Sequence, residues 1–399
     1  MPLTVPRDVA RVRPIARRGE GWIGEIDTIL QPGPGRRAPD CAHFGACGGC
    51  VAQHRDNDAY LAWKVSRLAT ELRRAGFDTP PIAQIVPSLP ATRRRMDLAA
   101  RRLTGRVTLG LHRSRGGEVI DLAECPVLHP DLLSLIAPAR LLLSSLAALR
   151  REASLIVNLL DSGPDMLLRT DGELAATDRA KLLSFAHSQH LARVSWARGT
   201  DTPEPVCVLR PPVTSLSGVA IAPPPGAFLQ ATAAGEAAII AAVLDALPAK
   251  RSVRSRAADL FAGCGTISFA LARSINVTAF EGDAAQTSAC RDAANRAGLM
   301  GKIEVRQRDL SRQPLTAAEL SGFAAVILDP PHGGAAAQIP AIAQSGVARV
   351  IYVSCDPVSL GRDARVLREA GYHLAKVTPI DQFLWSARLE AVAIFHLGR

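Results

Sequence analysis

Two segments in the C-terminal half of the chain carry residue types suited to nucleophilic chemistry. Cys355 ends the apolar run VARVIYVSC, and Asp329-Pro330-Pro331 follows the earlier apolar run AAVIL. Each run is typical of a buried strand, and ligands bind outside the carboxyl ends of the strands in an open parallel sheet. We therefore expect the thiol and the acid to face one crevice, with Cys355 as a nucleophile. The alternative is a small buried thiol, the usual state of a free cysteine.

A glycine turn precedes these segments and has the features of a nucleotide site. In DLFAGCGTISF, Gly263 and Gly265 allow a tight turn and a close approach to a ligand, and the adjoining Thr266 is assigned to the same site. The next strand-like run ends in Glu281, which is placed to bind ribose hydroxyls. The turn lacks the third glycine of a dinucleotide fingerprint, so hydride transfer is disfavoured. This order, with acids after the third and fourth strands, resembles a class I S-adenosylmethionine methyltransferase. Those two acids are Asp309 and Asp329.

A compact group of thiols lies nearer the N-terminus. Three cysteines fall within ten residues of a loop, namely Cys41, Cys47 and Cys50, and Cys125 is a fourth candidate. Four thiolates suit zinc or an iron–sulfur cluster. The chain has no second Cys-x2-Cys pair, which weakens the zinc-ribbon interpretation, and two glycines before Cys50 would let backbone amides turn toward the sulfurs. Three further cysteines are interpreted as packing residues: Cys207, Cys264 and Cys290.

The elements that must position these residues follow from the pattern of apolar residues. From residue 257 onward strand-like and helix-like segments alternate, which predicts a doubly wound α/β sheet. Residues 60–76 have the pattern of an amphipathic basic helix, and residues 126–150 also look helical. Strand-like runs occupy much of 90–125 and 153–210. The segment APPPGAFLQ marks a boundary before the α/β part.

Composition bounds the class of protein. The chain has 399 residues, 48% of them apolar, and a formal net charge of +10, which allows two or three domains with aliphatic cores. Arginine outnumbers lysine and suits phosphate, so the simplest partner is nucleic acid, although a generally basic background is the alternative. No signal peptide or membrane-spanning run is visible. We therefore expect a cytoplasmic monomer with reduced thiols, without membrane association or an obligate protein partner.

Taken together, these motifs resemble the bacterial 5-methyluridine RNA methyltransferases, the uracil-C5 enzymes of ribosomal and transfer RNA. The motifs occur in the expected order over roughly residues 41–399. They are the four cysteines, Phe228-Leu229-Gln230, DLFAGCGTISF, FEGD, DPP, VSCDP and a final Asp381-x-Phe383 before Glu390. The resemblance implies a class I, Rossmann-like methyltransferase domain over 221–399. It further implies an α+β iron–sulfur and RNA-binding domain over 41–220, and a truncated or absent RNA-binding barrel over 1–40.

The resemblance also implies roles for individual residues. The four cysteines would hold a [4Fe–4S] cluster, Cys355 would attack uracil C6, and Glu390 would remove the C5 proton. Four positions would line the S-adenosylmethionine site: Gln230, Phe261, Glu281 and Asp329. Gln230 and Asp329 would hold the base edge and the cofactor amine.

The chain departs from the family pattern at several positions near these motifs. Thr232 and Asp356 stand where Asn is common, and His332 stands where Arg usually follows Asp-Pro-Pro. Leu384, Ser386 and Arg388 replace the more usual Pro, Thr and His. These departures bear on substrate choice more than on reaction type.

The expected chemistry makes demands on the site and on the RNA. A free thiol is mostly protonated at neutral pH, so we expect the surroundings of Cys355 to favour the thiolate, with the Asp356 carboxylate directed away. The target uridine must be unpaired or flipped out. Basic runs could track the phosphates, although each could equally form a solvated face. These runs are Arg93-Arg94-Arg95, Arg101-Arg102, Arg113 and Arg115.

Several alternatives stay open on the sequence. Ribosomal RNA is favoured over transfer RNA because the cysteine group is typical of the ribosomal branch. RNA cytosine-C5 enzymes carry Cys after Asp-Pro-Pro and amino-methylating enzymes carry an aromatic residue there, so His332 fits neither. An iron–sulfur RNA-binding protein without catalysis is the alternative from another class.

Overall fold

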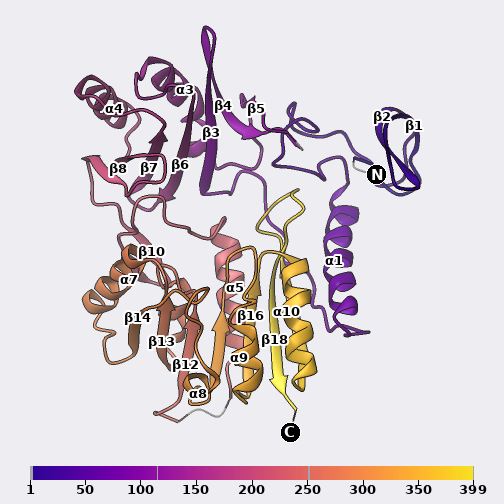
Figure 1. Cartoon of the computed structure of the whole chain (residues 1–399), viewed down its shortest axis with the longest axis vertical. Helices are drawn as coiled ribbons and strands as arrows, with labels where there is room; N and C mark the ends of the chain where they lie inside the picture. The colour runs from indigo at the N-terminus through magenta and orange to yellow at the C-terminus, as the bar shows by residue number, and fades with distance from the viewer. Residues whose placement is uncertain (1–2, 115, 250–251, 399) are drawn as a thin grey trace.

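Two seven-stranded sheets dominate the fold, one above the other in Figure 1. The structure is a computed structural model and describes residues 3–114, 116–249 and 252–398. Among these residues, no helix combines the length and the apolar character needed to cross a bilayer.

The C-terminal sheet has the strand order β14-β13-β12-β15-β16-β18-β17. Only β18 runs antiparallel to its neighbours. The strands are β12 (Arg256–Leu260), β13 (Asn276–Glu281), β14 (Ile303–Gln307), β15 (Ala325–Leu328), β16 (Arg349–Ser354), β17 (Tyr372–Ile380) and β18 (Glu390–Leu397). The order turns outward in both directions from β12 and β15, so the predicted doubly wound α/β sheet is confirmed.

Helices cover both faces of this sheet, which explains why its strands read as unbroken apolar runs. Ala257 and Ile327 point to one core, whereas Ala258 and Leu328 point to the other. The first core includes residues of α5 (Ala233–Asp245), α6 (Thr266–Leu271) and α7 (Ala284–Arg296). The second includes residues of α1 (Asn57–Arg74), α8 (Ala317–Leu320), α9 (Ile339–Gln344) and α10 (Pro357–Glu369).

The N-terminal sheet has the order β5-β4-β3-β6-β7-β8-β9 and is antiparallel except between β7 and β8. Its strands are β3 (Arg95–Leu103), β4 (Arg106–His112), β5 (Val119–Asp121), β6 (Glu152–Leu160), β7 (Gly163–Thr170), β8 (Arg193–Arg198) and β9 (Glu204–Val208). The parallel pair needs a crossover, which α4 (Ala176–Ser188) supplies. The helical pattern over 126–150 corresponds to two short helices, α2 (Pro130–Leu133) and α3 (Ile136–Ser145).

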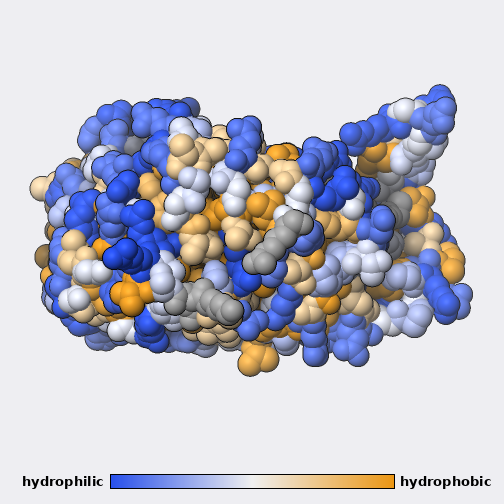
Figure 2. All heavy atoms as spheres, turned by 90° about the horizontal axis from the view of Figure 1, so that it is seen from below, coloured by the Kyte–Doolittle hydropathy of each residue, from blue (hydrophilic) through white to orange (hydrophobic). Residues whose placement is uncertain are grey.

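Two hairpins complete the fold. The first pairs β1 (Val9–Arg18) with β2 (Gly21–Gln31), and nearly all of its residues are exposed. It stands apart from both sheets at the right of Figure 1, and Figure 2 shows an arm on that same side. The second pairs β10 (Thr214–Leu216) with β11 (Val219–Ile221), where the chain passes from the upper sheet to the lower one.

Helix α1 comes early in the chain but packs against α10 beside the C-terminal sheet. Its buried face carries Lys64, which pairs with Asp381 just after β17; both side chains are completely buried. The Tyr60 hydroxyl donates to the other oxygen of Asp381 at 2.7 Å, and Lys64 Nζ donates to the Phe383 carbonyl at 2.8 Å. These contacts bind the segment 381–389, between β17 and β18, to α1.

Breaking the Lys64–Asp381 ion pair should lower the concentration of denaturant at which the protein unfolds. Lys64→Met leaves the Asp381 carboxylate buried without its cation, so we expect a loss of about 3–5 kcal/mol in the free energy of unfolding. Chemical denaturation followed by circular dichroism measures it. Lys376→Met is the matched control, because the Lys376–Asp245 pair is about half exposed and should contribute roughly 0–1 kcal/mol. Equal effects of the two substitutions would contradict the interpretation.

Candidate active site at the carboxyl edge of the C-terminal sheet

Strand register brings the predicted chemical residues to one edge of the C-terminal sheet. Leu260 pairs with both Phe280 and Leu328, so the residues that follow these strands lie side by side. Ser354 pairs with Ala391 in the antiparallel β16–β18 ladder, which places Cys355 opposite Glu390. The direction of β18 thus matters: because it runs antiparallel to β16 and β17, it begins at the edge where those two strands end.

A continuous chain of polar side chains crosses this edge. Gln230 Nε2 donates to Asp329 Oδ2 at 3.1 Å, and Gln382 Nε2 donates to Gln230 Oε1 at 2.8 Å. Gln382 Nε2 also donates to Glu390 Oε2 at 2.5 Å. The sequence singled out three of these residues but missed Gln382, because an amide in a loop has no periodic or spacing signal. This set of hydrogen bonds links Asp329 to Glu390, the residue predicted to act as the base.

Burial and like charge raise the pKa values of the acids in this chain. Glu390 is only 2% exposed, and desolvation, with a smaller contribution from the nearby Asp329, raises its pKa. Desolvation and the neighbouring Asp259 raise the pKa of Asp329 in turn. Protons are therefore held more tightly here than at ordinary carboxyls, which suits groups that exchange protons near neutral pH.

Cys355 lies half-buried between β16 and α10, and its surroundings disfavour the thiolate. Burial, followed by the charges of Glu390 and Asp329, raises its pKa to about 12, and Arg388 acts in the opposite direction. The expectation that the surroundings favour the thiolate is therefore wrong for the protein alone, because burial and then the charges of nearby acids disfavour the anion. The Asp356 carboxylate accepts from the Ser359 amide at 3.3 Å as the N-cap of α10, yet its charge also contributes to the raised pKa.

The two glycines of the turn serve different purposes. Gly263 and Gly265 both have left-handed backbones, with φ of +55° and +91°. A Cβ added to Gly265 would lie 2.7 Å from Cys290 Sγ, so this glycine is needed for helix packing. At Gly263 the nearest atom would be Gln286 Oε1, a more distant 3.5 Å, so its backbone is the one that a ligand can approach. Phe261, at the start of the turn, is a non-glycine residue with φ of +62°, a strained geometry that is common at functional sites.

Glu281 and Asp309 lie at the ends of β13 and the strand beside it. Glu281 accepts the backbone amides of Gly263 and Asp283, each at 2.8 Å, which ties it to the glycine turn. A carboxylate has about four lone-pair positions, so acceptor capacity for ribose hydroxyls is left. Asp309 is exposed and accepts the Ser311 amide at 3.0 Å. Thr266 is the first residue of α6, directly after the turn.

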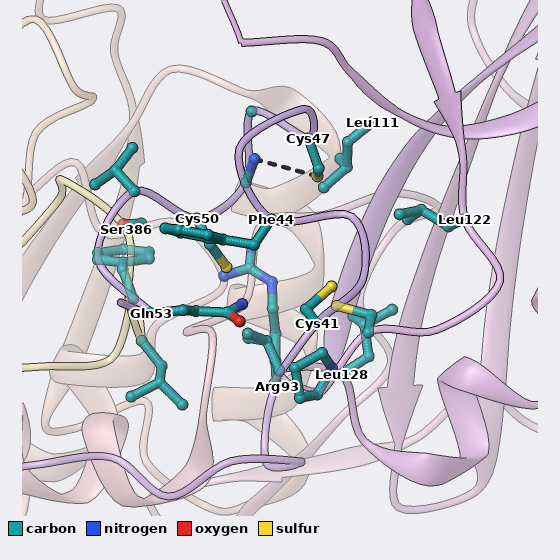
Figure 3. Close-up of a pocket in the computed structure, with 18 of the residues that line it drawn as sticks. Cys41, Phe44, Cys47, Cys50, Gln53, Arg93, Leu111, Leu122, Leu128 and Ser386 are labelled. Carbon is teal, nitrogen blue, oxygen red and sulfur yellow. Dashed lines mark hydrogen bonds between the residues drawn. The ribbon is translucent and has the colours of Figure 1, made fainter. Parts of the chain in front are cut away.

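The four predicted thiol ligands line one cavity of about 420 Å³ between the two sheets. Figure 3 shows three of them, Cys41, Cys47 and Cys50, with Arg93 among them; Cys125 completes the lining. The Gly49 amide donates to Cys47 Sγ at 3.4 Å, as expected for amides that turn toward the sulfurs. Burial raises the pKa of the Cys50 thiol to about 12.

Within the ranges that the structure describes, no three His, Cys, Asp or Glu side chains have the spacing of ligands to one metal ion. Thiolates around zinc lie roughly 3.8 Å apart, from the Zn–S distance and tetrahedral geometry. The described thiol positions therefore do not form a tetrahedral zinc site.

Two of the arginines expected to track phosphates have internal roles instead. Arg94 forms an ion pair with Glu236 of α5, and Arg102 donates to backbone carbonyls at the end of α3, including that of Leu143. Arg93 lines the cysteine cavity, whereas Arg101 is exposed. Arg113 pairs with Glu118 on the surface, and Arg115 lies outside the described residues. The sequence did not predict these internal roles, because the partner acid or carbonyl of each arginine is distant in sequence.

Cys264 and Cys290 are buried, as predicted for packing residues.

Two of the departures from the family pattern contact each other. Arg388 Nη1 lies 2.5 Å from His332 Nδ1, and both side chains are exposed beside the site. His332 follows Asp-Pro-Pro and Arg388 precedes Glu390 by two residues. A guanidinium is therefore present next to Asp-Pro-Pro although it comes from a different segment.

The fold and this site define the class of S-adenosylmethionine-dependent methyltransferases with a Rossmann-like sheet. The Pyrococcus abyssi tRNA (uracil-54, C5)-methyltransferase in complex with S-adenosyl-L-homocysteine has a similar structure, with a TM-score of 0.70. The match covers 99% of this chain and 94% of that one at 18% identity, so it bears on the fold alone. No family model matches the chain.

Curated relatives are similar over nearly the whole chain. An RNA methyltransferase of Mesorhizobium japonicum is 40% identical over 93% of this chain and 87% of its own length. One of Caulobacter vibrioides is 38% identical over 99% and 93%. The 23S rRNA (uracil(1939)-C(5))-methyltransferase of Pectobacterium atrosepticum is 31% identical over 98% and 87%. The chain belongs to this family of RNA methyltransferases, which confirms the family expected from the sequence.

The raised pKa of Cys355 predicts slow alkylation of the free protein. Its alkylation rate by iodoacetamide should rise about tenfold per pH unit from pH 7 to 10 without a plateau, because only the thiolate reacts. Peptide mass spectrometry resolves Cys355 from the other cysteines. In denaturant the alkylation rate of the same peptide should be half-maximal near pH 8.5, the ordinary pKa of a cysteine, and should level off roughly one pH unit above it. A plateau below pH 9 in the folded protein would show that the thiolate is already stabilised.

Proposed function

We propose that this chain transfers a methyl group from S-adenosylmethionine to C5 of a specific uridine in RNA through a covalent adduct on Cys355. The observation that carries the proposal is the pairing of Ser354 with Ala391, which sets a thiol opposite the buried acid Glu390 at the ligand-binding edge of a Rossmann-like sheet. A 31% identical relative that acts on uracil C5 of 23S rRNA supports the same reaction.

The proposed reaction uses the two residues in sequence. The Cys355 sulfur adds to uracil C6, which pushes electrons to C5 and makes that carbon nucleophilic. S-adenosylmethionine, when bound, would supply the electrophilic methyl group that C5 takes: its S–CH3 bond breaks and S-adenosylhomocysteine is the leaving group. Glu390 then removes the C5 proton, and the electrons left behind re-form the C5–C6 double bond as the C6–S bond breaks. The raised pKa of Glu390 makes its carboxylate a stronger base than an ordinary one.

Electrostatics around the sulfur support this order of steps. Two of the acids that raise the pKa of Cys355, Glu390 and Asp329, themselves have raised pKa values, so a proton held by Asp329 reduces the negative charge facing the thiol. Arg388 is the cation that favours the thiolate. Because a guanidinium only donates, His332 Nδ1 is the acceptor in their contact, which holds Arg388 at the site.

We place S-adenosylmethionine along the glycine turn and the neighbouring strand ends. The open side of Gly263 and the position of Glu281 beside it support this assignment. The remaining residues proposed to hold the cofactor are Gln230, Phe261, Gly265, Thr266, Asp309 and Asp329, with Gly265 acting through packing rather than contact.

We propose further that the thiols of Cys41, Cys47, Cys50 and Cys125 hold a [4Fe–4S] cluster. Their shared cavity and the amide directed at Cys47 support it. Residues 41–220 would then form the domain that holds the cluster and binds RNA, and residues 221–399 would form the catalytic domain. Residues 1–40 would be a short N-terminal segment outside both. Ribosomal RNA is the proposed substrate, since the 23S rRNA enzyme matches along nearly the whole chain.

Nucleoside mass spectrometry tests the reaction. Purified protein, S-adenosylmethionine and RNA from cells lacking the gene should yield 5-methyluridine. Cys355→Ala should abolish product, by at least about a hundredfold, because the nucleophile is lost. Glu390→Gln should form the methylated protein–RNA adduct but release it slowly, visible as a band of reduced mobility on a denaturing gel.

Cys207→Ala is the matched control, because this half-buried thiol lies in β9 away from the site. It should retain activity. Product that survives Cys355→Ala would exclude the covalent route, and 5-methylcytidine or a methylated amine would indicate another class of methyltransferase. Binding of RNA without any product would favour a non-catalytic RNA-binding protein.

The cluster has its own test. Protein purified without oxygen should contain about four irons and four sulfides per chain with broad visible absorbance. Cys50→Ser should lose most of this iron, whereas Cys207→Ser should retain it. One zinc per chain and a colourless protein would contradict the assignment.

A further inference from the structure

Gln382 occupies a fixed position behind the site. It is 2% exposed and lies just after β17. A Cβ added to Gly235 of α5 would lie only 2.7 Å from the Gln382 Cβ, so the helix packs directly on the stem of this side chain. The Ala231 amide donates to Gln382 Oε1 at 3.2 Å. Because Oε1 accepts from a backbone amide, Nε2 must be the donor that faces the site.

The two hydrogens of this amide go to different partners. One is directed to Gln230 Oε1 at 2.8 Å and the other to Glu390 Oε2 at 2.5 Å. Gln230 is oriented in consequence, since its oxygen is engaged and its Nε2 donates to Asp329. One side chain therefore sets the orientation of both its neighbours.

The same arrangement makes the two oxygens of Glu390 unequal. Oε2 accepts from Gln382, whereas Oε1 is buried and has no hydrogen-bond partner among the described residues. A buried oxygen without a partner is costly unless a ligand or a proton satisfies it. Glu390 takes up a proton on Oε1, because a proton on Oε2 would compete with the amide hydrogen that Gln382 already donates to that oxygen.

We propose that Gln382 is a positioning residue for the methyl-transfer reaction: it holds Glu390 Oε2 so that Oε1 alone receives the C5 proton, and it orients Gln230 at the same time. This inference rests on the proposed function and adds a residue to it. The hydrogen bond from Gln382 lowers the pKa of Glu390 against the larger effect of burial, and so keeps more of the base ionised.

Gln382→Met tests the inference, because methionine has a similar length and no amide. The covalent adduct should still form, but loss of the C5 proton should slow by at least about tenfold, so adduct accumulates on unmodified uridine RNA. The pKa of Glu390 should rise when its donor is lost. The low-pH limb of tritium release from [5-³H]uridine RNA should therefore move to higher pH, by on the order of one unit.

Gln338→Met is the matched control. Gln338 is also fully buried and bonds both backbone groups of Leu315, so its loss perturbs stability without touching the site. It should leave adduct lifetime and pH profile as in the wild type. Gln382→Glu is a second variant: it can donate to Glu390 only when protonated, so adduct should resolve faster at low pH than in Gln382→Met.

The outcomes separate this inference from the proposed function. Wild-type protein that makes no 5-methyluridine sinks the proposed function itself. An active wild type, with Gln382→Met unchanged in adduct lifetime and pH profile, overturns the role of Gln382 alone. Folded Gln382 variants that form no adduct would place the residue at an earlier step. Unfolding of both variants while Gln338→Met stays folded would reduce Gln382 to a structural role; either result overturns the inference.

Discussion

The buried ion pair between Lys64 and Asp381 is the constraint on which the site depends. It joins a helix from the N-terminal part of the chain to the segment that carries the active-site loop. Neither charge is solvated, so each needs the other, and the Tyr60 hydroxyl and the Phe383 carbonyl complete their hydrogen bonding. A hydrophobic segment would pack as tightly, but it would not fix the angle at which the chain leaves β17. The ion pair fixes that angle at Asp381, one residue before Gln382.

A second set of contacts connects the cysteine cavity to the same segment. The amides of Val51 and Ala52, directly after Cys50, both donate to the Trp385 carbonyl at 2.8 and 3.1 Å. Trp385 is buried and has a left-handed backbone, with φ of +56°. The loop that would hold a cluster and the loop that precedes Glu390 therefore share one carbonyl. Because ordering one loop orders the other, this contact couples the conformation of the cysteine loop to that of the loop before Glu390. The coupling needs no redox step.

Site residues at or directly after the end of a strand were predicted from the sequence more successfully than site residues that depend on contacts distant along the chain. Cys355, Asp329 and Glu281 end apolar runs, and parallel strands with both faces covered place such ends together. The raised pKa of Cys355 could not be predicted, because it depends first on burial and then on the charges of acids that include Glu390 and Asp329 from other segments. Arg94 looked like a phosphate contact, but its acid lies on α5, far along the chain. Gln382 matters only through three partners, Ala231, Gln230 and Glu390, which the tertiary fold brings together from different segments of the chain.

The nine residues from 381 to 389 are anchored at both ends and in the middle. Their first residue is held by Lys64, Trp385 is held by the cysteine loop, and Glu390 begins β18 in register with Ile380. Because this segment is held at three points, its length sets the register of β18. Adding or removing one residue would turn Glu390 to the other face of the sheet. Substitution is easier, as Leu384, Ser386 and Arg388 illustrate. The fold therefore constrains the length of this loop more strongly than the identity of the residues within it.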